Sequence, residues 1–392
     1  MIDFLKEAES LFDYTQTMRR DFHMHPELGF QEVRTAGIVA KELQSLGLEV
    51  STGVGKTGVV AVIEGRKPGP VLLLRADMDA LPIVEETGAA YASQNHGVMH
   101  ACGHDGHTAI LLTVAKMLHK VRNELPGSIK LVFQPAEEGM GGAEGMIRDG
   151  VLDNPKVDYV LGLHLWNEKP VGWLGIAAGP YMAGADEFKI TLTGKGGHGA
   201  APHTTADPIV AGAHIISALQ TIVARNVAPI DTAVVSVTTF HGGHAFNVIP
   251  QTAEMTGTIR TFKPEVRDLT LRRFKEVVEG VAQSLGCMAD VQLFHTAPAV
   301  INNAAVTNIV QQAAAKVLPN HHIDANNMAT MGSEDFAFFL NQAPGMFFFV
   351  GSANAERGLT YSHHHPKFDV DEAALPQAAA LMAQAAVDLL AQ

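Results

Sequence analysis

The first part of the chain alternates short apolar runs with a segment of helical periodicity. Three runs, at residues 70–77, 128–135 and 159–166, are almost continuously apolar and have the length of strands buried on both faces. Between the first two runs, the apolar positions of residues 108–121 recur at the spacing of a helix. Residues 1–20 also have the pattern of an amphipathic helix. Strands that alternate with helices in this way predict an α/β domain.

The pattern changes near Asp186, where strict alternation of apolar and polar residues replaces the continuous runs. Such alternation is typical of a sheet with one face in a core and the other in water. The order strand, helix, strand, strand, helix, strand is ferredoxin-like. We place the strands at residues 187–194, 232–240, 252–261 and 288–294, and the helices at residues 207–225 and 265–285.

After residue 299 the α/β pattern returns, with a helix at 305–318, a buried strand at 345–351 and a closing helix at 371–392. A chain of 392 residues is longer than a typical single core. The sequence therefore predicts one α/β domain, interrupted by an inserted domain. The chain would cross between the two domains twice, which allows a hinge there. The α/β domain comprises residues 1–185 and 299–392, and the inserted domain comprises residues 186–298.

Composition narrows the range of partners. Hydrophobic residues make up 47% of the chain and charged residues 18%, which is typical of a soluble globular protein. The net charge of −13 argues against nucleic acid or an anionic membrane as a partner. No apolar stretch is long enough to span a bilayer, and the N-terminus lacks the pattern of a signal peptide. With two cysteines, Cys102 and Cys287, we expect a disulfide-free protein of the cytoplasm.

One segment, residues 99–109, concentrates groups that bind metals. A thiolate, imidazoles and a carboxylate in one loop suit Zn²⁺ or another first-row divalent cation. Cys102 and a nearby histidine could instead form a nucleophile–base pair. Such a pair leaves the remaining ligand-type residues unexplained, so we favour a metal site. The segment holds His100, Cys102, His104, Asp105 and His107.

Further ligand-type residues follow predicted strands, where open α/β sheets bind their ligands. Glu137 and Glu138 come directly after the run 128–135. Adjacent side chains leave an extended backbone in opposite directions, so one carboxylate could face a metal ion and the other the water that the metal activates. His164 closes the run 159–166, and we expect it to be another ligand.

Two more segments contain candidate residues. Asp77 and Asp79 follow the run 70–77, where they form either a turn or part of the site. Near the C-terminus, His363–His365 precede Pro366. We expect a rigid, extended segment here, because proline confines the residue before it to extended conformations. One of these imidazoles could complete a metal site from across the domain.

These segments belong to a longer, ordered set of motifs that spans nearly the whole chain. The set runs RRDFHMHPELGFQE, LLLRADMDALPI, MHACGHDGHTA, FQPAEEG, GLHLW, GKGGHGAAPH, NVIP, GTIRT, MGSEDFAFF and HHPKFDVDE. Together it resembles the dinuclear-metal amidohydrolases. These include bacterial hippurate hydrolases and aminoacylases, plant indole-acetyl-amino-acid hydrolases and, more distantly, co-catalytic metallopeptidases such as glutamate carboxypeptidase.

The resemblance implies a metallopeptidase-like catalytic domain with a mixed central sheet and an inserted lid or dimerisation domain. It also implies two divalent metal ions per subunit, Zn or Mn, with Co or Ni as further candidates. Glu137 would be the general base and acid. Asp77 and Asp79 stand where distant relatives have a His-x-Asp metal segment, and we expect them, with Asp105, to orient the ligands and the loop. The implied ligands are Cys102, His104, Glu138, His164 and His364.

The inserted domain carries matching residues too. His198 corresponds to a histidine that reaches the substrate carbonyl, often across a dimer, and would stabilise the developing oxyanion. Asn247 and Arg260 correspond to residues near the substrate's carboxylate, which suits an arginine. The resemblance therefore also implies a homodimer or homotetramer formed through this domain.

We expect the chain to hydrolyse N-acyl amino acids to a carboxylic acid and a free amino acid. A carboxypeptidase or dipeptidase could use the same site on a peptide bond. A metal-binding protein without catalysis is a third alternative, but it would have no use for Glu137 beside Glu138. The preferred acyl group and amino acid do not follow from the sequence.

Overall fold

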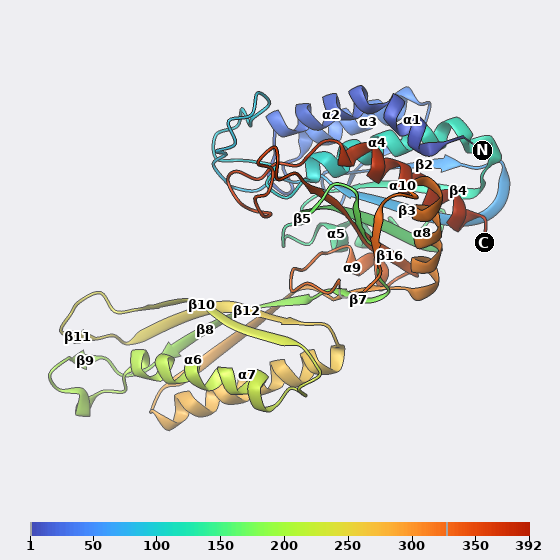
Figure 1. Cartoon of the computed structure of the whole chain (residues 1–392). Helices are drawn as coiled ribbons and strands as arrows, with labels where there is room; N and C mark the ends of the chain where they lie inside the picture. Colours follow the sequence, from blue (N-terminus) through green and yellow to red (C-terminus); the bar gives the residue numbers. More distant parts are fainter. Residues whose placement is uncertain (1, 327) are drawn as a thin grey trace. The chain divides into compact units, whose positions relative to one another are not determined.

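The structure is a computed structural model that describes residues 2–326 and 328–392. The chain divides into two units, each with its own hydrophobic core, and the second interrupts the first in the sequence (Figure 1). The first unit comprises Met1–Tyr181, Ile301–Ala329 and Asp335–Gln392, and the second comprises Met182–Val300 and Thr330–Glu334.

The short segment Thr330–Glu334 differs from the expected boundaries, which place it in the α/β domain. It joins the second unit through backbone bonds. The Ala183 N–H donates to the carbonyls of Thr330 and Gly332, at 3.1 and 2.9 Å. The pattern of apolar residues could not reveal this, because a single short extended segment has no periodicity of its own.

A mixed eight-stranded sheet forms the centre of the first unit, in the order β1-β2-β4-β3-β5-β16-β6-β15. β4, β3, β5 and β16 are parallel to their neighbours in this group, whereas β1, β2 and β6 introduce antiparallel pairs. The expected mixed sheet is confirmed. Its strands are β1 (Val50–Val54), β2 (Gly58–Glu64), β3 (Lys67–Asp77), β4 (Pro126–Gln134), β5 (Tyr159–Pro170), β6 (Trp173–Gly175), β15 (His322–Asp324) and β16 (Gly345–Ala353).

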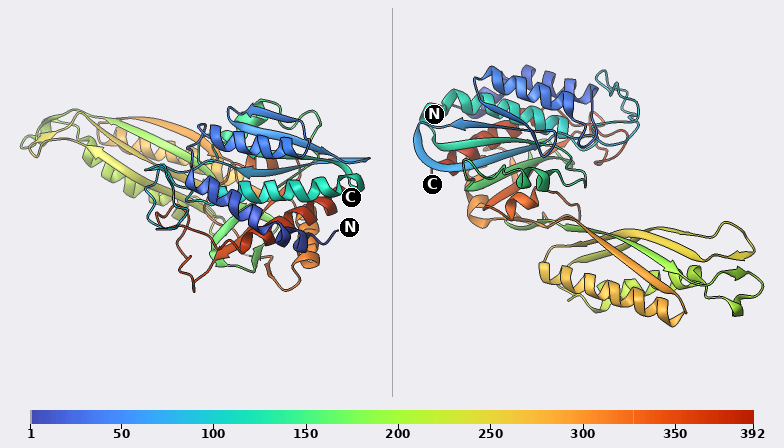
Figure 2. Two further views of the ribbon diagram at one scale, coloured as in Figure 1. Left: turned by 90° about the horizontal axis from the view of Figure 1, so that it is seen from above. Right: turned by 180° about the vertical axis from the view of Figure 1, so that it is seen from behind.

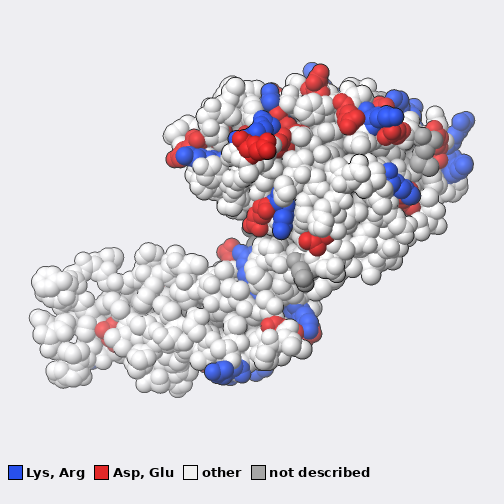
Figure 3. Space-filling view, in the orientation of Figure 1, with Lys and Arg blue, Asp and Glu red and all other residues white. Residues whose placement is uncertain are grey.

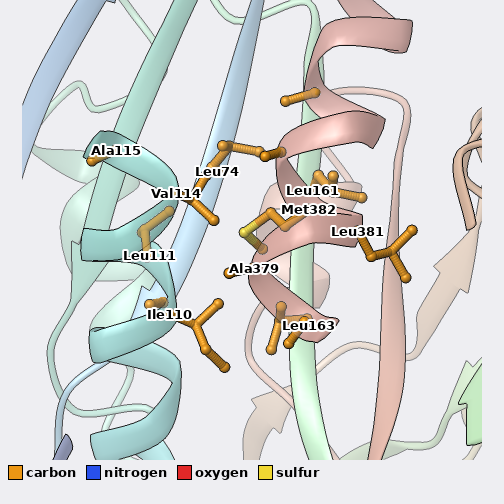
Figure 4. Packing of buried hydrophobic residues seen from close by; sticks show 14 of the residues in the cluster. Leu74, Ile110, Leu111, Val114, Ala115, Leu161, Leu163, Ala379, Leu381 and Met382 are labelled. Atoms are coloured by element: carbon orange, nitrogen blue, oxygen red, sulfur yellow. The ribbon is translucent and has the colours of Figure 1, made fainter. Parts of the chain in front are cut away.

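Helices cover the sheet of the first unit, with α1 to α4 on one side and the short α5 and α9 on the other (Figures 1 and 2). Figure 4 shows α4 and α10 packing through Ile110, Val114 and Met382 against leucines of β3 and β5. The helices are α1 (Phe4–Ser10), α2 (Phe12–Met24), α3 (Val33–Ser45), α4 (His104–Val121), α5 (Gly142–Arg148), α8 (Ala304–Val317), α9 (Ala337–Leu340) and α10 (Ala374–Leu390), with a 3₁₀ turn at Arg122–Glu124.

The single N-terminal helix expected for residues 1–20 is wrong, because the structure breaks it at Leu11 into α1 and α2. The Ser10 hydroxyl and the Leu11 N–H both bond to carbonyls of the last turn of α1. These bonds end the helix, which an amphipathic pattern alone does not show.

The second unit is a four-stranded antiparallel sheet in the order β10-β12-β8-β13, with α6 and α7 on one face (Figure 2). This is the expected ferredoxin-like arrangement. A small β9–β11 ribbon also belongs to this unit, and a β7–β14 pair is formed by the segments through which the chain enters and leaves it. The elements are β7 (Gly179–Met182), β8 (Gly184–Thr193), β9 (Gly197–His198), a 3₁₀ turn at Pro202–Thr204, α6 (Pro208–Arg225), β10 (Ala233–Gly242), β11 (Val248–Ile249), β12 (Thr252–Thr261), α7 (Pro264–Ser284), β13 (Met288–Ala297) and β14 (Val300–Asn302).

The expectation that no apolar stretch is long enough for a membrane span is wrong for α6, one helix among the described residues whose length and apolar composition would suit such a span. Its buried residues recur every three or four positions, as Ala211, Ile215, Leu219 and Ile222. They belong to the hydrophobic core of the second unit, which accounts for the apolar composition of this helix.

Candidate metal centre

The turn before α4 presents Cys102 and His104 to the interior. Gly103, with a φ of 95°, occupies the left-handed region that glycine adopts most easily. His104 is the first residue of α4, and its Nδ1–H donates to the Asp79 carbonyl at 2.9 Å. The His104 Nε2 is buried and makes no hydrogen bond. The Nδ1–H bond to a carbonyl thus orients the ring with Nε2 toward the interior, as in a histidine that binds a metal through Nε2.

His164 lies beside Cys102, with 3.4 Å between the His164 Nε2 and the Cys102 Sγ. Its Nδ1–H donates to the Leu165 carbonyl at 2.7 Å, so Nε2 is again the nitrogen left for a ligand. The expectation that His164 closes a strand is wrong, because β5 continues to Pro170. The pairing of β5 with β3 reaches only Gly162, however, so His164 lies beyond the paired residues, near the carboxyl end of β3.

Glu137 and Glu138 lie in the loop after β4. Ala136, just before them, has a φ of 53°. The Glu138 N–H donates to the Asp79 Oδ2 at 3.1 Å. One oxygen of each glutamate lies within 4.8 Å of a nitrogen of His104. The loop thus places both carboxylates at the edge of the sheet that carries the histidines.

His364 completes the group from the C-terminal part of the chain. Its Nε2 is 3.1 Å from the Glu138 Oε1, and together with Cys102 these side chains form a group that could hold a metal ion. The expected extended segment is wrong at this point, because His364 has a φ of 67°. Its N–H donates to the Ala101 carbonyl at 2.7 Å, which fixes the turn against the Cys102 segment.

The two histidines that flank His364 form hydrogen bonds with backbone groups. The His363 Nε2–H donates to the Leu165 carbonyl at 3.0 Å, and the His365 Nδ1 accepts the Lys367 N–H at 3.0 Å. The geometry therefore favours His364 among the three histidines.

His107 shows how one ring in the same segment serves a different purpose. Its Nδ1–H donates to the Asp77 Oδ1 at 2.7 Å, and its Nε2 accepts the Leu165 N–H at 2.9 Å. Both nitrogens are thus occupied, so His107 supports its neighbours instead of binding a metal. Asp77 is in turn held by the buried Arg75.

The charges of the ligand-type residues depend strongly on one another. Burial and the nearby Glu138 carboxylate raise the pKa of the Cys102 thiol. Burial alone would lower the pKa of His104, but Asp77 and Cys102 outweigh it and raise that pKa well above its usual range. Hydrogen bonds to Cys102 and Glu138 raise the pKa of His364 to about 10.

Asp105 lies beside this group in sequence but points elsewhere. Its Oδ2 accepts hydrogen bonds from Arg19 and His23, both at 2.8 Å. Arg19, His23 and the buried Arg75 were not predicted from the sequence as partners of these aspartates. The available signal was a charged residue inside an apolar pattern, as Arg75 is within the run 70–77.

The remaining candidates lie in the second unit. His198 in β9 pairs with Val248 in β11, directly after Asn247, so the ribbon brings His198 and Asn247 close together. Both residues are exposed. Arg260 in β12 is half-buried, and its Nη1 donates to the Ser333 hydroxyl at 2.6 Å.

Comparisons with known proteins place this arrangement in a family. Residues 73–388 match the family model Peptidase family M20/M25/M40. N-acetylcysteine deacetylase of Bacillus subtilis (strain 168) is 42% identical over 374 residues, which cover 95% of this chain and 96% of the relative. Thermostable carboxypeptidase 2 of Saccharolobus solfataricus is 42% identical over 377 residues, which cover 95% of this chain and 94% of the relative.

A solved structure agrees with these relatives. The crystal structure of the Bacillus subtilis YXEP protein, described as a dinuclear metal binding peptidase from the M20 family, has a TM-score of 0.84 and 39% identity. The match covers 98% of this chain and 99% of that chain. The chain therefore belongs to peptidase family M20/M25/M40 and is an amide-bond hydrolase.

Proposed function

We propose that this protein hydrolyses N-acyl amino acids. Water adds to the acyl carbon, the C–N bond breaks, and the products are a carboxylic acid and a free amino acid. The observation that carries the proposal is the pair Glu137 and Glu138, of which each has an oxygen within 4.8 Å of a His104 nitrogen. A hydrolase of this kind needs one carboxylate as a ligand and another as a base.

The proposal includes two divalent metal ions, Zn or Mn, with Co or Ni as alternatives. They would be held by Cys102, His104, Glu138, His164 and His364. The donor set fits such ions, because it combines a thiol, imidazoles and a carboxylate. The buried His104 Nε2, which makes no hydrogen bond, is further support. When bound, the ions would lower the pKa of a water molecule and polarise the substrate carbonyl.

Glu137 is the proposed general base and acid. It takes a proton from the attacking water and later gives it to the leaving amine. The residue is 9% exposed, so it reacts in surroundings that largely exclude bulk water. From the second unit, we propose that His198 stabilises the oxyanion, and that Asn247 and Arg260 bind the substrate's carboxylate.

We extend the proposal to assembly as a cytoplasmic homodimer or homotetramer through the second unit. β10 and β13 stand at the two ends of its sheet, and α6 exposes Val210 and Val223. The face of this unit seen in Figure 3 carries few charged side chains. Open sheet edges and apolar surface favour association, which light scattering after gel filtration would measure.

A second candidate activity is that of a carboxypeptidase or dipeptidase. The specific support is the carboxypeptidase relative, which is as similar to this chain as the deacetylase is, at 42% identity. The same groups would serve, because a peptide bond is also an amide next to a carboxylate-bearing residue.

The experiment that tests the proposal measures amino-acid release from a panel of N-acyl amino acids and dipeptides. The protein is first stripped with a chelator and then supplied with Zn²⁺, Mn²⁺ or Co²⁺. We expect activity to vanish on stripping and to return with metal, with N-acyl amino acids the best substrates. Preference for dipeptides would support the second candidate, and activity that survives stripping would contradict the metal mechanism.

A further inference from the structure

Glu32 is a buried carboxylate that neither the reaction nor the ligand set uses. It precedes α3 and has no exposed surface. Its Oε1 accepts the backbone N–H of Ala136 at 2.9 Å, and its Oε2 accepts the Thr57 hydroxyl at 2.5 Å. Burial raises the pKa of Glu32, while these hydrogen bonds act in the opposite direction. Because both oxygens of this buried carboxylate accept hydrogen bonds, Glu32 fixes the positions of the two groups that donate to it.

The group that Glu32 holds is the residue before Glu137. Ala136 is fully buried, and its φ of 53° is one that a residue with a Cβ adopts only under constraint. Its carbonyl accepts the Gly142 N–H at 3.1 Å. The backbone of Gly29 packs so closely that a Cβ there would lie 3.2 Å from the Ala136 Cα. Hydrogen bonds at its N–H and its carbonyl, together with this packing, therefore maintain the conformation of Ala136.

A second carboxylate acts on the other side of Glu137. The Asp79 Oδ2 accepts the Glu138 N–H at 3.1 Å. The N–H groups of Ala136 and Glu138, on either side of Glu137, thus donate to two different buried carboxylates. Since Ala136 and Glu138 are both fixed, the direction in which the Glu137 side chain leaves the chain is fixed as well.

We propose that Glu32 is a positioning residue for Glu137, acting through the Ala136 amide. The inference rests on the proposed role of Glu137 as the general base. Without the acceptor on Glu32, the buried Ala136 N–H has no partner, and the residue can relax out of its left-handed conformation. Glu137 then turns away from the position in which it takes the proton. Binding of the substrate does not depend on this geometry, so the loss falls on kcat.

The test compares three variants in the metal-loaded enzyme. Glu32→Ala removes both acceptors, and we expect kcat to fall at least about tenfold, with KM changed less than about twofold. Glu32→Gln keeps an acceptor for the Ala136 N–H and can donate to Thr57, so it should restore kcat to within a few-fold of the parent. Glu32→Asp keeps the charge but is shorter by one methylene. It should therefore lose kcat, and it remains informative if Glu32→Ala does not fold.

Glu27 provides a matched control from the same segment. Its two oxygens accept the N–H groups of Arg34 and Thr35, so it holds α3 instead of Ala136. Glu27→Ala should lower thermal stability but leave the kcat of the folded enzyme near that of the parent. Equal losses of kcat in Glu27→Ala and Glu32→Ala would overturn the proposal, as would a Glu32→Ala enzyme with unchanged kcat or a Glu32→Gln enzyme that is not restored.

The pH dependence separates positioning from general loosening of the fold. If Glu32 acts through Glu137, the acidic limb of the kcat–pH profile moves in Glu32→Asp, and it stays in place in Glu27→Ala. A limb unchanged in Glu32→Asp would contradict the proposal. Glu137→Gln is measured in parallel. If it keeps the parent kcat, the proposed function of Glu137 fails. If it abolishes turnover while the Glu32 variants remain fully active, only the positioning role fails.

Discussion

Arg19 and Asp105 form an ion pair with 2.8 Å between Nε and Oδ2, and neither side chain is exposed. The pair joins α2 to the first turn of α4, directly beside His104. The same guanidinium reaches the Asp369 carboxylate at 2.6 Å, on the segment that follows His364. One buried cation therefore ties together two parts of the chain that carry proposed ligands.

Arg19→Met should strongly destabilise the first unit. It leaves Asp369 without its cation in the interior and Asp105 with only the His23 ring as a partner, and breaking a buried pair in this way costs about 3–5 kcal/mol. Trp166 and Trp173, the two tryptophans of the chain, both lie in the first unit. Tryptophan fluorescence in a urea titration therefore measures the free energy of unfolding of that unit.

Arg20→Met is the control for this prediction. Arg20 also pairs with a carboxylate, Glu372, but its side chain is 38% exposed. We expect its loss to cost about 1 kcal/mol or less. Equal destabilisation by the two substitutions would show that the burial of Arg19 has no special effect.

The stability of the first unit should also depend on pH through His23. Burial lowers the pKa of His23, but the Asp105 carboxylate and a hydrogen bond to Glu85 outweigh it and raise the pKa to about 9. The folded state thus holds a proton that the unfolded chain releases near pH 6.5. This contribution is complete below about pH 6.5 and is lost as the pH rises through about 9.

The expected result is a fall in the free energy of unfolding across that interval, with a slope of at most about 1.4 kcal/mol per pH unit from this group. Urea titrations of the parent and of His23→Gln at several pH values measure it. The slope should become smaller in His23→Gln and stay that of the parent in His25→Gln, whose half-buried ring lies two residues away. A parent and a His23→Gln protein with the same slope would rule out His23 as the source.

Glu137→Gln should abolish turnover and leave metal binding intact. The amide cannot accept the proton, and general base catalysis contributes about 10²–10⁴-fold to a rate. Metal content per subunit and kcat are measured on the same preparation. Full loss of metal together with activity would contradict the role and make Glu137 a ligand.

Cys102→Ala should weaken metal binding. It removes the thiol that lies 3.4 Å from the His164 Nε2 and shares a group with Glu138 and His364. Competition with a chromogenic chelator measures the change in affinity. Cys287→Ala is the control, because that cysteine is buried in the core of the second unit. Activity lost with metal binding unchanged would instead favour a thiol nucleophile.

Apolar periodicity predicted the strands and helices that are long and buried. The run 159–166 lies within β5, and 108–121 forms most of α4. β6 and β15 contain three residues each, too few to show a period. β1 lies at the edge of the sheet with mostly exposed side chains, so it has no apolar run to recognise.

The residue types of the metal group were recognisable because each stands near the end of a buried strand or in a dense local segment. The contacts that support these residues could not be recognised from the sequence. Glu32 meets Ala136, and Arg19 meets Asp369, across long stretches of sequence. A sequence pattern shows that a charge occurs at an unusual position, but it does not name the partner that makes burial tolerable.

The place of β16 in the central sheet has a consequence for the order of events during synthesis. This strand lies between β5 and β6, yet it is made after the whole of the second unit. A chain emerging from the ribosome can fold the contiguous residues 182–300 while the first sheet still has a gap at its middle. His364 follows later still. The nascent enzyme therefore acquires its last proposed ligand only when translation is almost finished, and a product terminated before His364 lacks that ligand.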